Sequence, residues 1–202
     1  MSPIVGALFF AMTGYAAILI ASLVTAHIEP YADGPEPGAQ PPTWLLVLGC
    51  SVVGAVVTAN AASGIQVAAA AIACTGLAAA WYSDAKCGIV PDLFSVVPLV
   101  LVLALGAAEQ QWSIFISALI PFVPFAAAAA LSHGRGMGWA DVKLAALAGA
   151  ILGTQMALLA LAAACIAAVL YARARNAPAK PIAFAPYIAG AIAAAIPFAG
   201  FL

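Results

Sequence analysis

The chain has 202 residues, of which 66% are hydrophobic and only 6% charged, and its formal net charge is -1. A soluble domain carries about 25% charged residues, so this composition excludes an ordinary soluble protein and predicts an all-α polytopic membrane protein. There is no basic run that would indicate binding to nucleic acid. The four cysteines form no CxxC pair, so the sequence indicates neither a zinc site nor a disulfide framework.

The apolar runs predict about eight transmembrane helices, because a bilayer needs about 20 apolar residues per helix. In chain order, the expected spans are 4–25, 44–60, 65–83, 92–108, 112–131, 141–152, 154–171 and 182–202. No Lys or Arg precedes the first span, so we expect it to be retained rather than removed as a secretory signal. We expect one membrane-embedded domain over 1–202, in which 1–43 form the first helix and a polar cytoplasmic loop and 44–202 form the helix bundle.

The basic residues predict how the chain is oriented. All of them fall on loops that eight alternating spans place on one side of the membrane: Lys86, Arg135, Lys143, Arg173, Arg175 and Lys180. The positive-inside rule makes this side cytoplasmic and puts both termini outside the cytoplasm. Asp84 and Asp141 then lie on the cytoplasmic face, each expected at the start of a helix that enters the membrane.

Two carboxylates at a membrane boundary can perform acid–base hydrolysis. If Asp84 and Asp141 lie close together, they cannot both ionise cheaply, so they share a proton. One then acts as base on a water while the other polarises the scissile carbonyl. The nearby glycines, Gly134, Gly136 and Gly138, would let the backbone approach an extended peptide. From spacing alone an alternative stays open, namely that both aspartates only cap helix N-termini.

Three segments together resemble the type IV prepilin peptidases, which are intramembrane aspartic proteases of the Gly-x-Gly-Asp type. Gly-Met-Gly-Trp-Ala-Asp-Val-Lys-Leu at 136–144 resembles the family's second aspartate motif. Asp-Ala-Lys-Cys-Gly-Ile-Val-Pro-Asp at 84–92 is similar to the first motif. Pro-Ile-Ala-Phe-Ala-Pro at 181–186 resembles the segment that opens the family's last helix.

The resemblance implies an enzyme of the bacterial inner membrane that cuts the basic leader from prepilins or pseudopilins at the cytoplasmic face, after a Gly. It implies that Asp84 and Asp141 are the catalytic pair and that Gly136, Gly138 and Lys143 shape the site. Asp92 and the acids of the 27–43 loop would add negative charge that attracts a basic leader. No metal and no cofactor are expected, the partners are the substrate and the lipid bilayer, and the oligomeric state stays open.

The chain departs from the family pattern in two places. Ala140 stands where the Gly-x-Gly-Asp pattern has glycine, and we expect activity to survive unless that backbone needs a positive φ. The 27–43 loop has no cysteine, whereas larger members carry a zinc-binding insertion there and also N-methylate the mature pilin. The sequence therefore predicts a peptidase without methyltransferase activity.

Other interpretations remain. An eight-span protein with two membrane acids could be a proton-coupled transporter, although that class favours acids near the bilayer midplane and an internal repeat. An inactive homologue that helps to assemble a pilus is a further alternative. His133 is expected to be a solvated loop residue, and Cys87 lacks a motif-placed histidine that would activate it as a nucleophile.

Overall fold

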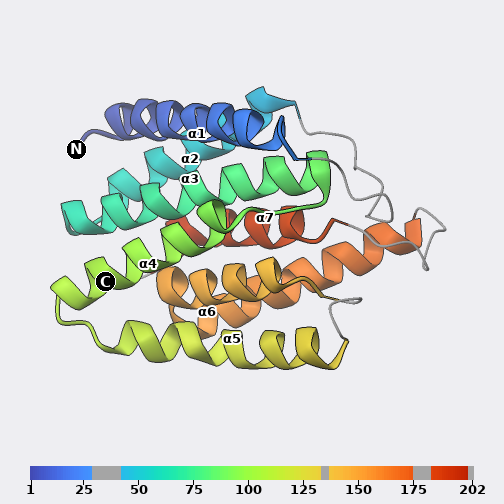
Figure 1. The fold of residues 1–202 in the computed structure, drawn as a ribbon. Helices are drawn as coiled ribbons and strands as arrows, with labels where there is room; N and C mark the ends of the chain where they lie inside the picture. Colours follow the sequence, from blue (N-terminus) through green and yellow to red (C-terminus); the bar gives the residue numbers. More distant parts are fainter. Residues whose placement is uncertain (29–41, 133–136, 175–182, 200–202) are drawn as a thin grey trace.

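The computed structural model of the protein describes residues 1–28, 42–132, 137–174 and 183–199. This part of the chain is a bundle of helices without a β-strand (Figure 1). In chain order the elements are α1 (Pro3–Thr25), α2 (Thr43–Asn60), α3 (Gly64–Cys87), α4 (Asp92–Ala108), α5 (Ser113–Leu131), α6 (Trp139–Ala174), α7 (Ala185–Ala195) and a 3-10 turn, η1 (Ile196–Phe198).

The bundle has the length and the surface of a membrane protein. Five helices, α1, α2, α3, α5 and α6, are long and apolar enough to cross a bilayer, and α4 and α7 with η1 form shorter apolar helices. Large apolar side chains also point outward, as Ile4, Leu131 and Leu159 do at 74%, 83% and 65% exposure. The all-α multi-pass fold is confirmed, whereas the count of eight spans is not and stays a prediction.

α6 is two helical arms joined at Gly153. This glycine has φ 71° and ψ 166°, a backbone conformation that only glycine adopts readily. A straight helix of 36 residues would be about 54 Å long and would hold its two ends far apart. Instead, the chain reverses at Gly153, and the second arm runs back beside the first (Figure 1). The Tyr171 ring near the end of the second arm lies 5.8 Å from the Tyr187 ring of α7.

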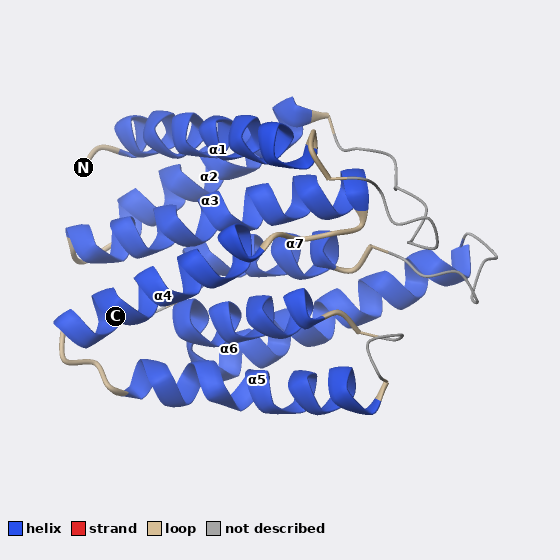
Figure 2. Ribbon diagram, in the orientation of Figure 1, coloured by secondary structure: helices blue, strands red, loops and turns tan. Residues whose placement is uncertain are grey.

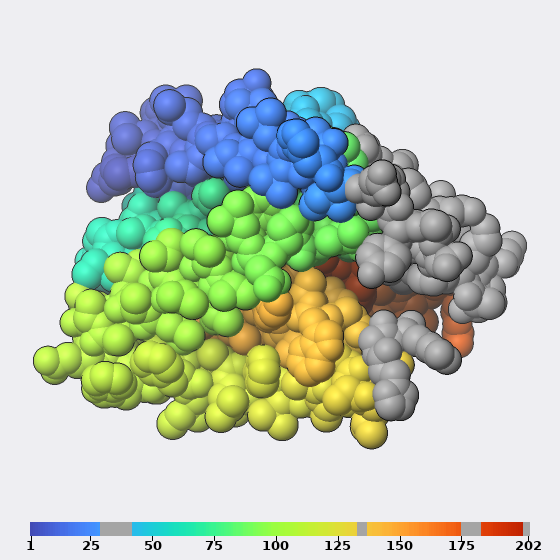
Figure 3. Space-filling view, viewed as in Figure 1, coloured from blue at the N-terminus to red at the C-terminus, as the bar shows by residue number. Residues whose placement is uncertain are grey.

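Small residues bring neighbouring helices close together. A β-carbon added to Gly6 of α1 would lie 2.1 Å from Thr58 Oγ1 of α2. One added to Gly149 of α6 would lie 2.0 Å from the backbone oxygen of Ser117 in α5. Contacts this short require glycine, and small residues at helix interfaces are the usual means of packing helices in lipid. In the face drawn in Figure 3, α1 in blue, α3 in teal to green, α4 in lime and α5 in yellow follow one another, with part of α6 visible in orange beside α4 and α5.

The ends of α1, α3 and the second arm of α6 lie at the same end of the bundle as the starts of α2, α6 and α7 (Figure 1). Lys86 ties two of these ends together, since its Nζ donates a hydrogen bond to Thr25 Oγ1 at 3.1 Å. Lys143 and Arg173 lie at this end too, whereas Glu109 follows α4 at the opposite end. The described basic residues thus share one end of the bundle, which we call the basic end.

Candidate active site

Asp84 lies in the last turn of α3, and the expectation that it opens a helix was wrong. The helix continues through Ala85 and Lys86 to Cys87, because these residues are compatible with a helix and the chain leaves it only at Gly88. A carboxylate at the C-terminal end of its own helix is disfavoured by the helix dipole. Here the compensation comes from another helix.

That helix is α7, whose positive N-terminal end faces Asp84. The Asp84 Oδ2 atom accepts a hydrogen bond from the backbone N–H of Ala185, the first residue of α7, at 3.1 Å. The two residues are 101 positions apart in the sequence. Asp84 is only 7% exposed, so a buried carboxylate is held by a distant helix N-terminus, where such a charge is favoured.

Asp141 lies in the first turn of α6, as expected from the sequence. Its Oδ2 atom accepts a hydrogen bond from the backbone N–H of Gly138, just before the helix, at 3.2 Å. This is one half of a capping box, in which the third helical residue reaches back to the residue before the helix. Asp141 is 8% exposed and therefore almost as buried as Asp84.

The two carboxylates lie within electrostatic range of each other at the junction of α3, α6 and α7. Within the described part of the chain, neither aspartate forms an ion pair, and the Oδ1 atom of each has no hydrogen-bond partner. Each aspartate thus caps a helix N-terminus with one oxygen and keeps the other available. Capping does not replace an acid–base role here, because the two roles use different oxygens.

Lys143 and Asp92, both expected to shape the site, are paired with each other. The Lys143 ammonium donates to Asp92 Oδ1 in a close ion pair. Asp92 is the first residue of α4, and Lys143 follows Asp141 by two positions. The pair therefore joins the start of α4 to the start of α6, and it offsets the negative charge that Asp92 would add to the face.

Gly138 contributes its N–H group rather than conformational freedom. A β-carbon at this position would meet Asp141 Oδ2 at 3.5 Å, an ordinary contact, and the residue has no positive φ. Ala140, the departure from the family pattern, lies within α6 and also has no positive φ. Gly136 and His133 lie outside the described residues.

Two backbone contributors to the site were not predicted from the sequence. One is Ala185, whose N–H binds Asp84. The sign of a helix start here was Pro186, because proline is favoured in the first turn of a helix. The other is Gly88, which ends α3 with φ 69° and donates its N–H to the backbone oxygen of Asp84 at 2.8 Å. A glycine just past a helix is the usual sign of such a left-handed cap.

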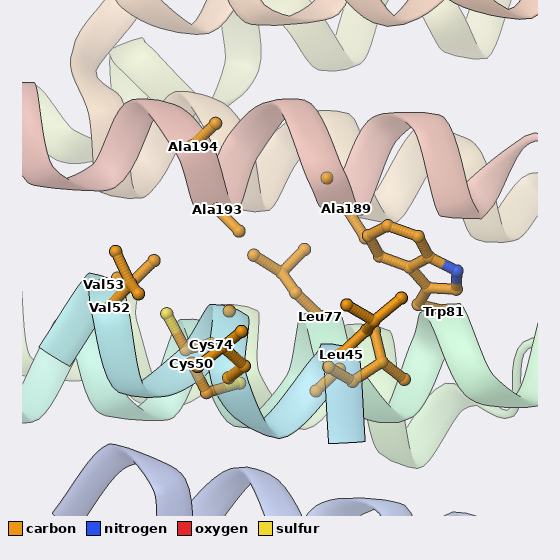
Figure 4. A pocket seen from close by; sticks show the side chains of 15 residues that line it. Leu45, Cys50, Val52, Val53, Cys74, Leu77, Trp81, Ala189, Ala193 and Ala194 are labelled. Carbon is orange, nitrogen blue, oxygen red and sulfur yellow. The ribbon is translucent and has the colours of Figure 1, made fainter. Parts of the chain in front are cut away.

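An apolar groove lies between α2, α3 and α7 (Figure 4). Its volume is about 520 Å³. Trp81, on its wall, precedes Asp84 by three positions, and Ala189 follows Ala185 by one helical turn. No Asp, Glu, His, Lys or Arg lines the groove, although the thiols of Cys50 and Cys74 do. Among the residues that the structure describes, no cluster of His, Cys, Asp or Glu could hold a metal ion.

Comparison with protein families gives a match to the type IV leader peptidase family over residues 71–173, just over half of the chain. The matched stretch contains both aspartates and the Lys143–Asp92 pair. No curated protein and no solved structure matches the chain.

Proposed function

The chain belongs to the type IV leader peptidase family, and we propose on this basis that it is an aspartic endopeptidase in which Asp84 and Asp141 hydrolyse one peptide bond of a membrane-bound substrate. The observation that carries the proposal is the pair itself. Two buried carboxylates from α3 and α6 lie within electrostatic range of each other, and each is oriented by one backbone N–H group. Orientation by backbone groups leaves a free oxygen on each side chain for a water or a carbonyl.

The reaction needs one proton on the pair. The ionised carboxylate takes a proton from a water, whose oxygen attacks the scissile carbonyl carbon, while the protonated carboxyl donates its hydrogen to the carbonyl oxygen. The tetrahedral intermediate collapses when the C–N bond breaks and the amine leaves with a proton from the pair. Because the carboxylates titrate as a unit, neither Asp84 nor Asp141 is assigned as the acid or the base.

We propose prepilins or pseudopilins as substrates, cut after a Gly at the end of a short basic leader. The basic end of the bundle is cytoplasmic by the positive-inside rule, and this orientation puts the aspartates at the cytoplasmic face of a bacterial inner membrane. The apolar segment behind the cut would stay in the bilayer beside the bundle. Acids of the 27–43 loop, which lies mostly outside the described residues, would attract the basic leader, and added salt would weaken this attraction.

The test is leader cleavage in membranes by the wild type and by Asp84→Asn and Asp141→Asn. Asparagine keeps the size of aspartate and can still accept the backbone hydrogen bond, but it cannot serve as acid or base. We expect each variant to lose at least about 100-fold in cleavage rate, the lower limit of what positioned acid–base groups contribute. Glu109→Gln, which removes an acid at the opposite end of the bundle, is the matched control and should cut like the wild type.

Near-normal cleavage by either folded aspartate variant would show that the catalytic assignment is wrong. A wild type that cuts no prepilin would instead remove the peptidase proposal and bring forward the transporter or the inactive homologue. Size-exclusion profiles and melting temperatures of the purified variants distinguish a lost reaction from a lost fold.

A further inference from the structure

The link between α3 and α4 is irregular backbone beside the aspartates. Residues 88–91 belong to no helix or strand, and Figure 2 draws them as a stretched loop between the two helices. Gly88 turns the chain out of α3 with its positive φ, and Pro91 precedes the first residue of α4. The two residues between them are largely covered by the fold, since Val90 is 9% exposed and Ile89 is partly buried.

The backbone of Ile89 and Val90 is unpaired. No residue of the described chain forms a hydrogen bond with the N–H or C=O group of either one. Buried backbone polar groups are almost always paired in folded proteins. In a membrane protein, non-helical backbone persists only where it is packed in protein or lines a cavity that contains polar partners. This two-residue edge therefore has four hydrogen-bonding groups that the rest of the described fold does not use.

The same link is anchored at both ends to the candidate active site. At one end, the N–H of Gly88 donates to the backbone oxygen of Asp84 at 2.8 Å. At the other end, Asp92 is paired with Lys143, which follows Asp141 by two positions. The unpaired backbone thus begins just after α3, the helix that carries Asp84. It ends at the start of α4, which the ion pair with Lys143 holds near the start of α6 and Asp141.

We propose that Ile89 and Val90 bind the scissile segment of the substrate as an added β-strand, through main-chain hydrogen bonds. This inference rests on the proposed peptidase function and names how that site holds its substrate. A peptide bond inside a helix has its N–H and C=O groups occupied, so the segment to be cut must be extended to meet both carboxylates. An extended segment then exposes main-chain groups that Ile89 and Val90 can pair with.

The proposed pairing agrees with an enzyme that accepts varied substrates and with the position of Pro91 at the end of the link. Strand addition gives affinity through the main chain, so it suits an enzyme that must accept segments with different side chains. Pro91 has no N–H group, so pairing stops where α4 begins and the edge stays short. Successive N–H groups of a strand point in opposite directions, so only one of the two N–H groups should face the substrate.

The experiment removes single N–H groups from both partners in the full-length enzyme. An α-hydroxy acid in place of Ile89 or of Val90 turns one backbone amide into an ester and keeps the side chain. The matched control is the same change at Ile4, whose N–H is also unbonded in the first turn of α1, at the opposite end of the bundle. The substrate is a synthetic peptide with a basic leader, a Gly and the start of an apolar segment, either unmodified or N-methylated at one of the residues that flank the cut.

We expect wild-type kcat/KM to fall about tenfold or more when the N-methyl group is at alternating positions, and much less at the positions between them. One of the esters at Ile89 and Val90 should lower kcat/KM about three- to tenfold, as the loss of one hydrogen bond does, while the other ester and the Ile4 ester should not. For the ester that matters, adding the N-methyl group at its partner position should give a combined loss that differs from the sum of the two single losses, because the two changes remove the two neighbouring hydrogen bonds of one residue pair.

The inference is overturned if the kcat/KM of the wild-type enzyme does not alternate with the position of the N-methyl group in the substrate. This measurement uses only the wild-type enzyme, so it does not depend on whether a variant folds. It is also overturned if both esters at the link behave like the Ile4 ester, since the link would then bind only water or lipid headgroups. Failure of the wild type to cut the unmodified peptide would instead remove the peptidase proposal, and this inference with it.

Discussion

Gly149 of α6 can be tested against Gly49 of α2 with the same substitution, because their surroundings differ. A β-carbon at Gly149 would lie 2.0 Å from the Ser117 backbone oxygen and 2.8 Å from Ala118 Cα, both in α5. A β-carbon at Gly49 would have no atom within 4 Å. Both glycines lie inside helices, so Gly→Ala brings the same gain in helix propensity at both positions.

The two substitutions should change stability in opposite directions. At Gly149 the conflict is with backbone atoms, which cannot rotate away, so the first arm of α6 must move off α5. Overpacking of this kind costs about 1–3 kcal/mol or more, against a propensity gain of up to about 1 kcal/mol. Gly149→Ala should therefore lower the unfolding free energy by about 1–2 kcal/mol, and Gly49→Ala should raise it by about 0.5–1 kcal/mol.

The assay is thermal unfolding of the purified variants in one detergent, with leader cleavage measured in parallel. For a chain of this size, 1 kcal/mol corresponds to about 2–4 °C, so the melting temperatures of the two variants should lie on opposite sides of the wild type. Gly149→Ala should also lower cleavage, because Asp141 lies two turns earlier on the arm that is displaced. If Gly149→Ala melts at or above the wild type, then α6 and α5 do not pack as closely as described and the reasoning is wrong.

Two further predictions concern the site and the reaction. Gly138→Ala should cut within about threefold of the wild type, because the N–H that binds Asp141 remains and a β-carbon fits. Gly138→Pro removes that N–H and should cut at least about tenfold more slowly. Equal activity of the two variants in the cleavage assay would show that the hydrogen bond does not orient Asp141. With a methyl donor present, mass spectrometry of cleaved substrate should find a free, unmethylated N-terminus, since the 27–43 loop has no cysteine; a mass increase of one methyl group would contradict a peptidase-only enzyme.

The membrane fold and one side of the candidate site could be predicted from local sequence. Composition and apolar run length are sufficient to predict a multi-pass all-α protein, because the bilayer imposes helices of a known length. Asp141 was expected at a helix start, and its carboxylate does bind the N–H just before α6. This prediction succeeds because a helix N-terminus is defined by neighbours within one turn.

The parts that failed depend on contacts between distant segments. Asp84 was expected at the start of a helix, but a helix that is packed against its neighbours continues through polar residues until a glycine ends it. The pairing of Asp92 with Lys143 joins positions 51 apart, and no local pattern predicts it. The count of eight spans stays a prediction, because it depends on how the arms around Gly153 lie in the bilayer.

The segment that resembles the opening of the family's last helix brings no acid or base to the site. The position of Asp84 explains why this segment should still matter to the chemistry. A carboxylate in the last turn of α3 faces the negative end of its own helix dipole, so its charge is destabilised unless a positive group is nearby. The start of α7 supplies that group through the Ala185 N–H. It follows that the pair is assembled from three helices: α3 and α6 bring the carboxylates, and α7 holds one of them in place. A change that shifts α7 should therefore impair cleavage even when Asp84 and Asp141 are both intact.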